Sequence, residues 1–295
     1  MSSYRKEKLL SLATNEYSDY TTEELKILCR KVLEEGVHGF CSSPYVEGQQ
    51  PGDQLSEEQI RRRLEIIRPY TQWIRSFSCT DGNEMIPKIA KEYGIKTLVG
   101  AWLGTDPDTN EREITGLIKL ANEGHVDIAA VGNEVMYRDD LTEEELLGFI
   151  HQVKDTVDGV PIGYVDAYYE FDERPQITEA CDVILANCYP FWEGCSHEYA
   201  LLYMKDMYKR AVDASQGKKV IVTETGWPNQ GSSLGGAHPS YQNFLKYFIN
   251  TQKWSREEGI DIFYFSSFDE SWKSGDEGDV GPYWGIWDKN EKLKF

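Results

Sequence analysis

Two glutamates, Glu134 and Glu224, have the residue type and the setting for glycosidic bond chemistry. Each directly follows a short apolar segment, Ile128–Asn133 in one case and Lys219–Thr223 in the other. Burying a lone carboxylate costs free energy, so a carboxylate in such a place usually has a partner or a chemical task. For either residue alone, a helix cap or a pairing with a nearby lysine explains the position as well. Together they supply one carboxyl group to protonate a leaving oxygen and one carboxylate to stabilise or attack the anomeric carbon.

The elements that must position these glutamates alternate along the chain. Short apolar segments bounded by turns are separated by longer, charged segments with helical periodicity. The eight strand candidates are His38–Ser42, Trp73–Ser78, Lys96–Trp102, Ile128–Asn133, Ile162–Asp166, Val183–Asn187, Lys219–Thr223 and Asp261–Ser266. Three residue pairs have the spacing of a capping box at a helix start: Thr21/Glu24, Ser56/Gln59 and Thr142/Glu145.

Strands that alternate with helices run parallel and are joined by right-handed crossovers. Eight such units within 295 residues fit a closed (β/α)8 barrel better than an open doubly wound sheet. No GxGxxG follows an early strand and no GxxxxGK[ST] occurs, so nucleotide-binding folds lose support. The sequence predicts an α/β fold with a single (β/α)8 TIM barrel as the catalytic domain over residues 1–295, including a short polar N-terminal extension at about residues 1–20.

The active site of such a barrel lies at the C-terminal ends of the strands. Strands four and seven lie across the barrel mouth from each other, so Glu134 and Glu224 can converge on one bond. Mutual repulsion and partial burial can hold their pKa values apart. Asn133 adds a donor suited to a sugar 2-hydroxyl, and nearby Trp and Tyr residues offer stacking faces. This chemistry requires no metal and no organic cofactor.

Composition excludes several partners. The 50 Asp and Glu residues outnumber the 31 Lys and Arg residues, and the formal net charge is −19. Such a chain repels nucleic acids and anionic lipid, so we expect an uncharged or cationic ligand, no nucleic acid and no membrane. The polar N-terminus lacks a secretory signal, which favours a cytoplasmic protein, unless a leader has been removed from a secreted one. The six cysteines form no CxxC pair, and several lie in apolar runs, so we expect reduced structural thiols and no zinc site.

Two segments carry a family resemblance. Gly132-Asn133-Glu134 and Thr223-Glu224-Thr225-Gly226-Trp227-Pro228 resemble the two signatures of glycoside hydrolase family 17. The similarity extends over about residues 38–294 and includes Ser43–Tyr45, Asn187–Phe191 and Phe268–Lys273. The resemblance implies a retaining β-1,3-glucanase, with Glu134 as the acid/base and Glu224 as the nucleophile.

The same resemblance implies a set of substrate-binding residues. Around the −1 sugar we expect Tyr45, Asn133, Tyr189, Glu270 and Lys273. As aromatic stacking platforms or subsite walls we expect Phe191, Trp227, Trp272 and Trp284, although one of the three tryptophans is expected to belong to the core together with Trp287. Without the resemblance, Glu270 and Lys273 would be interpreted as a surface ion pair of little energetic weight.

The sequence also departs from the plant members of that family. Those members carry a further glutamate shortly before a final aromatic segment, whereas the equivalent run here, Gly281–Trp287, has no acid at that place. The segment between strands six and seven is short, so the layout is similar to that of compact microbial members, some of which transfer glucan chains. These departures therefore weaken the expectation of endo cleavage of long chains, but they do not affect the expectation of a retaining mechanism.

Three functions remain open at this point. The first is hydrolysis of β-1,3-glucan or its oligosaccharides, with endo and exo action undecided. The second is glucanosyl transfer through the same covalent intermediate, either elongating or forming a β-1,6 branch. The third and least favoured is an inactive glucan-binding module, because both glutamates and their flanking residues are intact. A retaining mechanism predicts that the carboxyl groups of Glu134 and Glu224 lie about 5–5.5 Å apart. The sequence does not indicate an oligomeric state.

Overall fold

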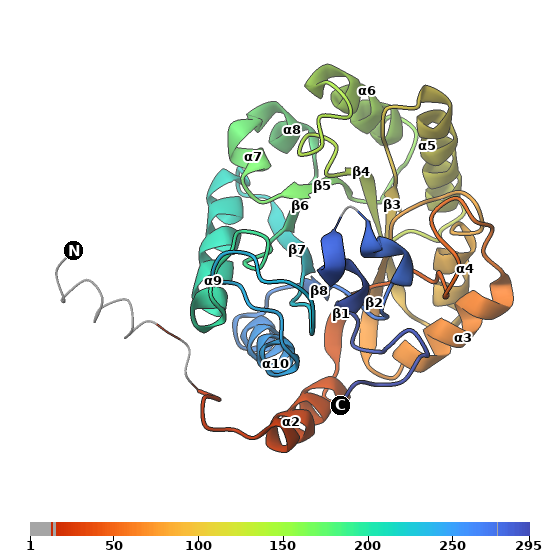
Figure 1. The fold of residues 1–295 in the computed structure, drawn as a ribbon. Helices are drawn as coiled ribbons and strands as arrows, with labels where there is room; N and C mark the ends of the chain where they lie inside the picture. The colour runs from red at the N-terminus through yellow and green to blue at the C-terminus, as the bar shows by residue number, and fades with distance from the viewer. Residues whose placement is uncertain (1–12, 14–15, 276) are drawn as a thin grey trace.

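The computed structural model describes Ala13 and residues 16–275 and 277–295, so most of the expected N-terminal extension lies outside the described residues. Eight parallel strands close into a barrel in sequence order, with β8 beside β1, and helices surround them (Figure 1). The strands are β1 Val37–Cys41, β2 Thr71–Ser76, β3 Lys96–Ala101, β4 Ile128–Asn133, β5 Ile162–Ala167, β6 Val183–Asn187, β7 Lys219–Thr225 and β8 Ile262–Tyr264. The predicted single (β/α)8 barrel is confirmed.

The predicted strand bounds hold best where the apolar run is sharply delimited. Strands β4 and β6 match their expected ranges, and β1, β2, β3 and β5 differ by one or two residues. Two differences are corrections. Strand β7 continues through Thr225, so Glu224 lies within the strand and does not follow it. Strand β8 is only three residues long, because regular pairing with both neighbours stops at Tyr264.

Helices form the outer ring of the barrel. They are α2 Thr22–Glu34, α3 Glu57–Ile67, α4 Met85–Glu92, α5 Pro107–Asn122, α6 Glu143–Lys154, α7 Glu170–Glu173, α8 Pro175–Ala180, α9 His197–Ala214 and α10 Tyr241–Glu258. The three predicted capping boxes all form, at the starts of α2, α3 and α6. Two 3₁₀ segments after β8, η1 Ser271–Ser274 and η2 Gly278–Tyr283, lie in front of the barrel centre in Figure 1.

Side chains of the strands pack in two layers. Leu98, Val165 and Leu185 face the barrel interior, and their neighbours Val99 and Tyr164 pack against the outer helices. This alternation explains why nearly continuous apolar runs predicted the strands, since both faces are buried. All six cysteines are free thiols, and five of them are buried. Among the described residues, no helix combines the length and the apolar character that crossing a membrane requires.

Candidate active site

An extra residue in β7 directs Glu224 into the barrel mouth. Ala186 of β6 pairs with Val222, but the next residue, Asn187, pairs with Glu224, which leaves Thr223 as the added residue. A bulge of this kind breaks the inward–outward alternation of a strand. As a result, two adjacent side chains of β7 reach the same partner. The Thr223 hydroxyl donates to Asn187 Oδ1 at 2.8 Å, and Asn187 Nδ2 donates to Glu224 Oε1 at 3.2 Å.

A second irregularity lies at the end of β4. The pairing of β4 with β5 shifts between Ala130 and Asn133. Gly132 has φ +88°, and a Cβ at this position would lie 2.9 Å from a methyl carbon of Val135, so only glycine fits. Glu134 follows with φ +51°, a left-handed conformation that a residue with a side chain adopts at a cost. The turn places Glu134 at the barrel mouth, opposite β7.

Glu224 is buried, with 6% of its surface exposed, and it receives three hydrogen bonds. Arg75 Nη1 donates to Oε1 at 2.6 Å, and the Tyr189 hydroxyl donates to Oε2 at 2.7 Å. The third donor is the Asn187 amide. A guanidinium, a phenol and an amide together suit an ionised carboxylate, which accepts hydrogen bonds through both oxygens.

Glu134 has a different environment. It is partly exposed, and Asn187 Nδ2 donates to its Oε1 at 2.8 Å. Burial within the barrel mouth and the nearby Glu224 carboxylate raise the pKa of Glu134 to about 7, although the Asn187 amide opposes this rise. A carboxyl group with this pKa can hold a proton near neutral pH and release it again, which is the requirement for a general acid and base.

Asn187 connects the two carboxyl groups. Its single amide nitrogen donates to both Oε1 atoms, at 2.8 Å to Glu134 and 3.2 Å to Glu224. These two oxygens therefore lie at most about 6 Å apart, which is compatible with the carboxyl separation of about 5–5.5 Å in retaining glycosidases. Asn187 belongs to the segment Asn187–Phe191, which carries part of the family resemblance, but nothing in that segment indicates that Asn187 bridges the two glutamates.

Arg75 is a site residue that the sequence analysis missed. Its fully buried guanidinium pairs with Glu224, donates through Nη2 to Asn133 Oδ1 at 2.5 Å, and lies 4.3 Å from the centre of the Phe77 ring. Asn133 thus uses its oxygen for Arg75, while its Nδ2 makes no hydrogen bond within the described part of the chain and remains a donor for a ligand. The available signal was an arginine within a predicted barrel strand, directly after Ile74.

Glu270 and Lys273 form a buried pair, which distinguishes them from a surface ion pair. Lys273 Nζ lies 3.3 Å from Glu270 and 3.2 Å from Glu277, and it lies over the Phe265 ring. Burial lowers the pKa of Lys273, but attraction to Glu270 and Glu277 outweighs burial and raises it. Glu277 was also missed. It supplies a second acid beside Lys273, a few residues before the segment in which the plant-type glutamate was sought.

The expected aromatic residues divide into two groups. Tyr189 donates to Glu224, Tyr45 accepts a hydrogen bond from Asn83 Nδ2 at 3.1 Å, and Trp272 is partly exposed and packs edge-on against Tyr45. These three side chains belong to the neighbourhood of the carboxyl pair or of the β1 loop beside it.

The other group requires a correction. Phe191, Trp227 and Trp284 are buried, and Trp227 has 0% of its surface exposed. Their rings pack edge to face against one another through Phe191, and Trp227 Nε1 donates to the backbone of His238. Without an accessible face they cannot stack on a sugar, and Trp284 instead packs edge-on against Tyr189. The adjacent Trp192 is 38% exposed and tilts against Trp284.

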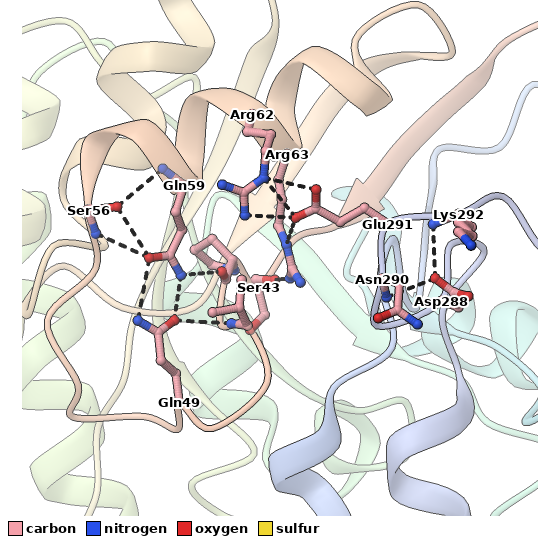
Figure 2. Close-up of polar contacts among 12 residues, drawn as sticks. Ser43, Gln49, Ser56, Gln59, Arg62, Arg63, Asp288, Asn290, Glu291 and Lys292 are labelled. Carbon is pink, nitrogen blue, oxygen red and sulfur yellow. Dashed lines mark hydrogen bonds and ion pairs between the residues drawn. The ribbon is translucent and has the colours of Figure 1, made fainter.

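The loop that carries Tyr45 is held by side chains of α3 and by the C-terminal segment (Figure 2). Gln59 Nε2 donates to Pro44 O at 2.7 Å, and Arg63 Nη1 donates to Ser43 O at 3.0 Å. Arg63 is itself paired with Glu291 near the C-terminus, at 3.2 Å. Side chains of α3 therefore hold the two consecutive carbonyl groups that precede Tyr45.

Comparisons with known proteins identify relatives among the glycoside hydrolases. A family model described as the BtgE/BtgC glycoside hydrolase domain matches residues 39–285. The chain is 30% identical over 251 residues to a glucan 1,3-beta-glucosidase of Schizosaccharomyces pombe, covering 79% of this chain and 78% of the relative. It is 28% identical over 258 residues to the glucan 1,3-beta-glucosidase BGL2 of Candida albicans, covering 79% and 83%.

A solved structure gives the same indication. The chain superposes on a family 17 beta-1,3-glucanosyltransferase from Rhizomucor miehei with a TM-score of 0.79 and 27% sequence identity, covering 88% of this chain and 96% of that one. An active-site mutant of the Rhizomucor enzyme, with the same coverage and TM-score, has been solved in complex with laminaritriose.

Proposed function

The chain is a member of glycoside hydrolase family 17 with a BtgE/BtgC-type catalytic domain, and from this premise we propose that it is a retaining enzyme that cleaves β-1,3-glucosidic bonds. The observation that carries the proposal is the Asn187 bridge, which holds Glu134 and Glu224 within about 6 Å of each other. A retaining enzyme holds its two carboxyl groups about 5–5.5 Å apart, so that a carboxylate can attack the sugar directly, whereas an inverting enzyme leaves about 6.5–9.5 Å for a water.

In the first step, the Glu224 carboxylate attacks the anomeric carbon while Glu134 gives its proton to the departing glycosidic oxygen. The C1–O bond breaks, the shortened glucan leaves as an alcohol, and an α-linked glucosyl ester on Glu224 remains. Arg75 and Tyr189 orient Glu224 and stabilise its charge before attack. The Asn133 amide is available to a sugar hydroxyl near the reacting carbon.

In the second step, Glu134 takes a proton from water, whose oxygen attacks C1 and displaces Glu224. The product keeps the β configuration. The charge of Glu224 contributes to the raised pKa of Glu134, so esterification of Glu224 removes part of that rise. Glu134 thereby becomes more acidic after the first step and is ionised when a base is needed.

The substrate assignment rests on the relatives. The Schizosaccharomyces and Candida relatives are named as glucan 1,3-beta-glucosidases, and the Rhizomucor mutant binds laminaritriose. A net charge of −19 agrees with an uncharged polysaccharide or oligosaccharide as the ligand. We therefore propose β-1,3-glucan or laminari-oligosaccharides as the substrate class.

Transfer to a second glucan is the alternative that a specific finding favours, because the Rhizomucor relative is a beta-1,3-glucanosyltransferase. Transfer uses the same glucosyl ester, and an acceptor sugar replaces water in the second step. The exposed Trp192, three residues after Tyr189 on the loop that follows β6, offers a face on which an acceptor could stack.

A time course on reduced laminari-oligosaccharides tests both readings, with Glu224→Ala run beside the wild type. Hydrolysis predicts only shorter chains from the wild type and none from the variant. Early products longer than the starting material would make transfer the main activity. Proton NMR of the first reducing-end product reports retention if it is the β anomer, and initial formation of the α anomer would contradict the proposed mechanism.

A further inference from the structure

The turn that carries Glu134 needs external support. Glu134 has φ +51° and follows Gly132 at φ +88°, so two of three consecutive residues adopt left-handed conformations. A residue with a side chain is held in this region only when its surroundings over-determine it. The supports of this turn therefore decide where the Glu134 carboxyl group points.

Three consecutive residues of β5 provide this support. Val165 O accepts the Glu134 N–H at 2.8 Å, the Tyr164 hydroxyl accepts the Met136 N–H at 2.9 Å, and Asp166 Oδ2 accepts the Tyr137 N–H at 3.3 Å. Of these three acceptors, the two side-chain groups are also joined to each other, because the Tyr164 hydroxyl donates to Asp166.

Both side chains lie outside the barrel interior. Tyr164 and Asp166 have no exposed surface, and the Tyr164 ring packs edge-on against Phe171 in the layer between the strands and the outer helices. They therefore have no route to the substrate. Burying the Asp166 carboxyl group in such a layer costs free energy unless the group is hydrogen-bonded. Its hydrogen bond from the Tyr137 N–H is therefore part of what holds Asp166 there. Asp166 also adds, after burial and Glu224, to the raised pKa of Glu134.

We propose that Tyr164 and Asp166 are positioning residues that fix the left-handed turn of β4 and thereby aim the Glu134 carboxyl group at the glycosidic oxygen. This inference rests on the proposed role of Glu134 as the acid/base. Tyr164→Phe removes the acceptor of the Met136 N–H, and Asp166→Asn weakens the acceptor of the Tyr137 N–H while keeping its shape.

The test compares two substrates that differ in their need for an acid. A laminari-oligosaccharide has a poor leaving group that must be protonated, whereas a dinitrophenyl β-laminaribioside has a leaving group that departs unprotonated. We expect Tyr164→Phe and Asp166→Asn each to lower kcat/KM on the oligosaccharide by about 10- to 100-fold, as a misaligned catalytic group does. The loss of kcat/KM on the aryl substrate should be less than about threefold, because its glycosylation step needs no acid.

Tyr264→Phe is the matched control. Tyr264 also lies within a barrel strand and is fully buried, but its hydroxyl has no hydrogen-bond partner among the residues that the structure describes. Partial misfolding lowers both rates equally and leaves their ratio unchanged, so the ratio separates positioning from stability. Equal losses on both substrates, or a ratio like that of Tyr264→Phe, would overturn the inference.

Glu134→Ala in the same assay keeps the two proposals apart. If Glu134→Ala fails to discriminate between the substrates, the acid/base role itself is wrong. If Glu134→Ala discriminates and the two β5 variants do not, only the positioning role is wrong.

Discussion

Glu134 after β4 and Glu224 on β7 are the same residue type at the same end of one barrel, and apart from a shared hydrogen bond from Asn187 their surroundings differ. Glu224 is buried, extended within its strand, and receives a guanidinium, a phenol and an amide. Glu134 is partly exposed, adopts a left-handed conformation, and its carboxyl group accepts a hydrogen bond from the shared Asn187 amide. The comparison teaches that the proposed division into nucleophile and acid follows from the donors that neighbouring strands supply, and not from the glutamates themselves.

The largest expected effect comes from removing the more strongly held carboxylate. Glu224→Ala should lower kcat/KM by on the order of 10⁴-fold or more, on oligosaccharides and on activated aryl glycosides alike, because no covalent intermediate can form. Glu134→Ala should lower it by about 10²- to 10⁴-fold on oligosaccharides only. Steady-state kinetics on both substrate types checks this. If both variants lost kcat/KM equally on the two substrate types, Glu224 and Glu134 would not have different roles.

Arg75 is expected to matter next. Arg75→Met leaves the buried Glu224 carboxylate without its guanidinium, which should cost about 3–5 kcal/mol in the free energy of unfolding and much of the activity. The added substitution Glu224→Gln should recover part of that stability, because the unpaired charge is then gone. Urea unfolding of the single and double variants measures this.

Arg62→Met serves as the control for Arg75. Arg62 also pairs with a glutamate, Glu291, but its side chain is half exposed, so solvent screens the pair and little stability should be lost. A similar loss in both arginine variants would mean that the Arg75–Glu224 pair has no special role.

The pH dependence separates the glutamates further. Glu134 must carry a proton in the first step, so kcat/KM on oligosaccharides should fall as the pH rises through about 7. Glu134→Gln should lack this alkaline limb in its residual activity. An alkaline limb near 7 that persists in Glu134→Gln would assign the titration to another group.

The smallest expected effect concerns stability. The pKa of Glu134 is raised in the folded state from an ordinary value of 4.5, so its stabilising protonation is complete below about pH 4.5 and is lost as the pH rises through 7. At pH 8 Glu134→Gln should therefore be more stable than the wild type, by about 3 kcal/mol, and at pH 4.5 the two should be similar. Urea unfolding at both pH values checks the sign, and a wild type that is the more stable at pH 8 would contradict it.

The fold could be predicted from the sequence because the barrel strands are buried on both faces and the helix starts carry capping boxes. Each capping box pairs an N-cap residue, Thr21, Ser56 or Thr142, with a residue only three positions later. Such a pattern can be recognised from a few neighbouring residues, without knowledge of the rest of the chain. The end of β7 was missed because its apolar run stops at Val222, whereas pairing continues past the bulge at Thr223 to Thr225.

The site could be predicted only where a motif marked it. Glu134 and Glu224 sit in recognisable segments, but Arg75 meets Glu224 across 149 positions of sequence, and no local pattern encodes such a pair. The tryptophans show the same limit. Trp192 and Trp227 both follow strands at the barrel mouth, yet one is exposed and the other is buried, because loops have no period from which burial can be read.

Azide trapping with a dinitrophenyl β-laminaribioside tests the division of roles most directly. In Glu134→Ala, the glucosyl ester still forms, and azide should attack it from the β face to give the β-glycosyl azide. In Glu224→Ala, azide should occupy the space of the missing carboxylate and displace the dinitrophenolate from the α face, giving the α-glycosyl azide. We expect these opposite anomers by proton NMR. The reverse assignment, or one anomer from both variants, would contradict the proposed roles of Glu134 and Glu224.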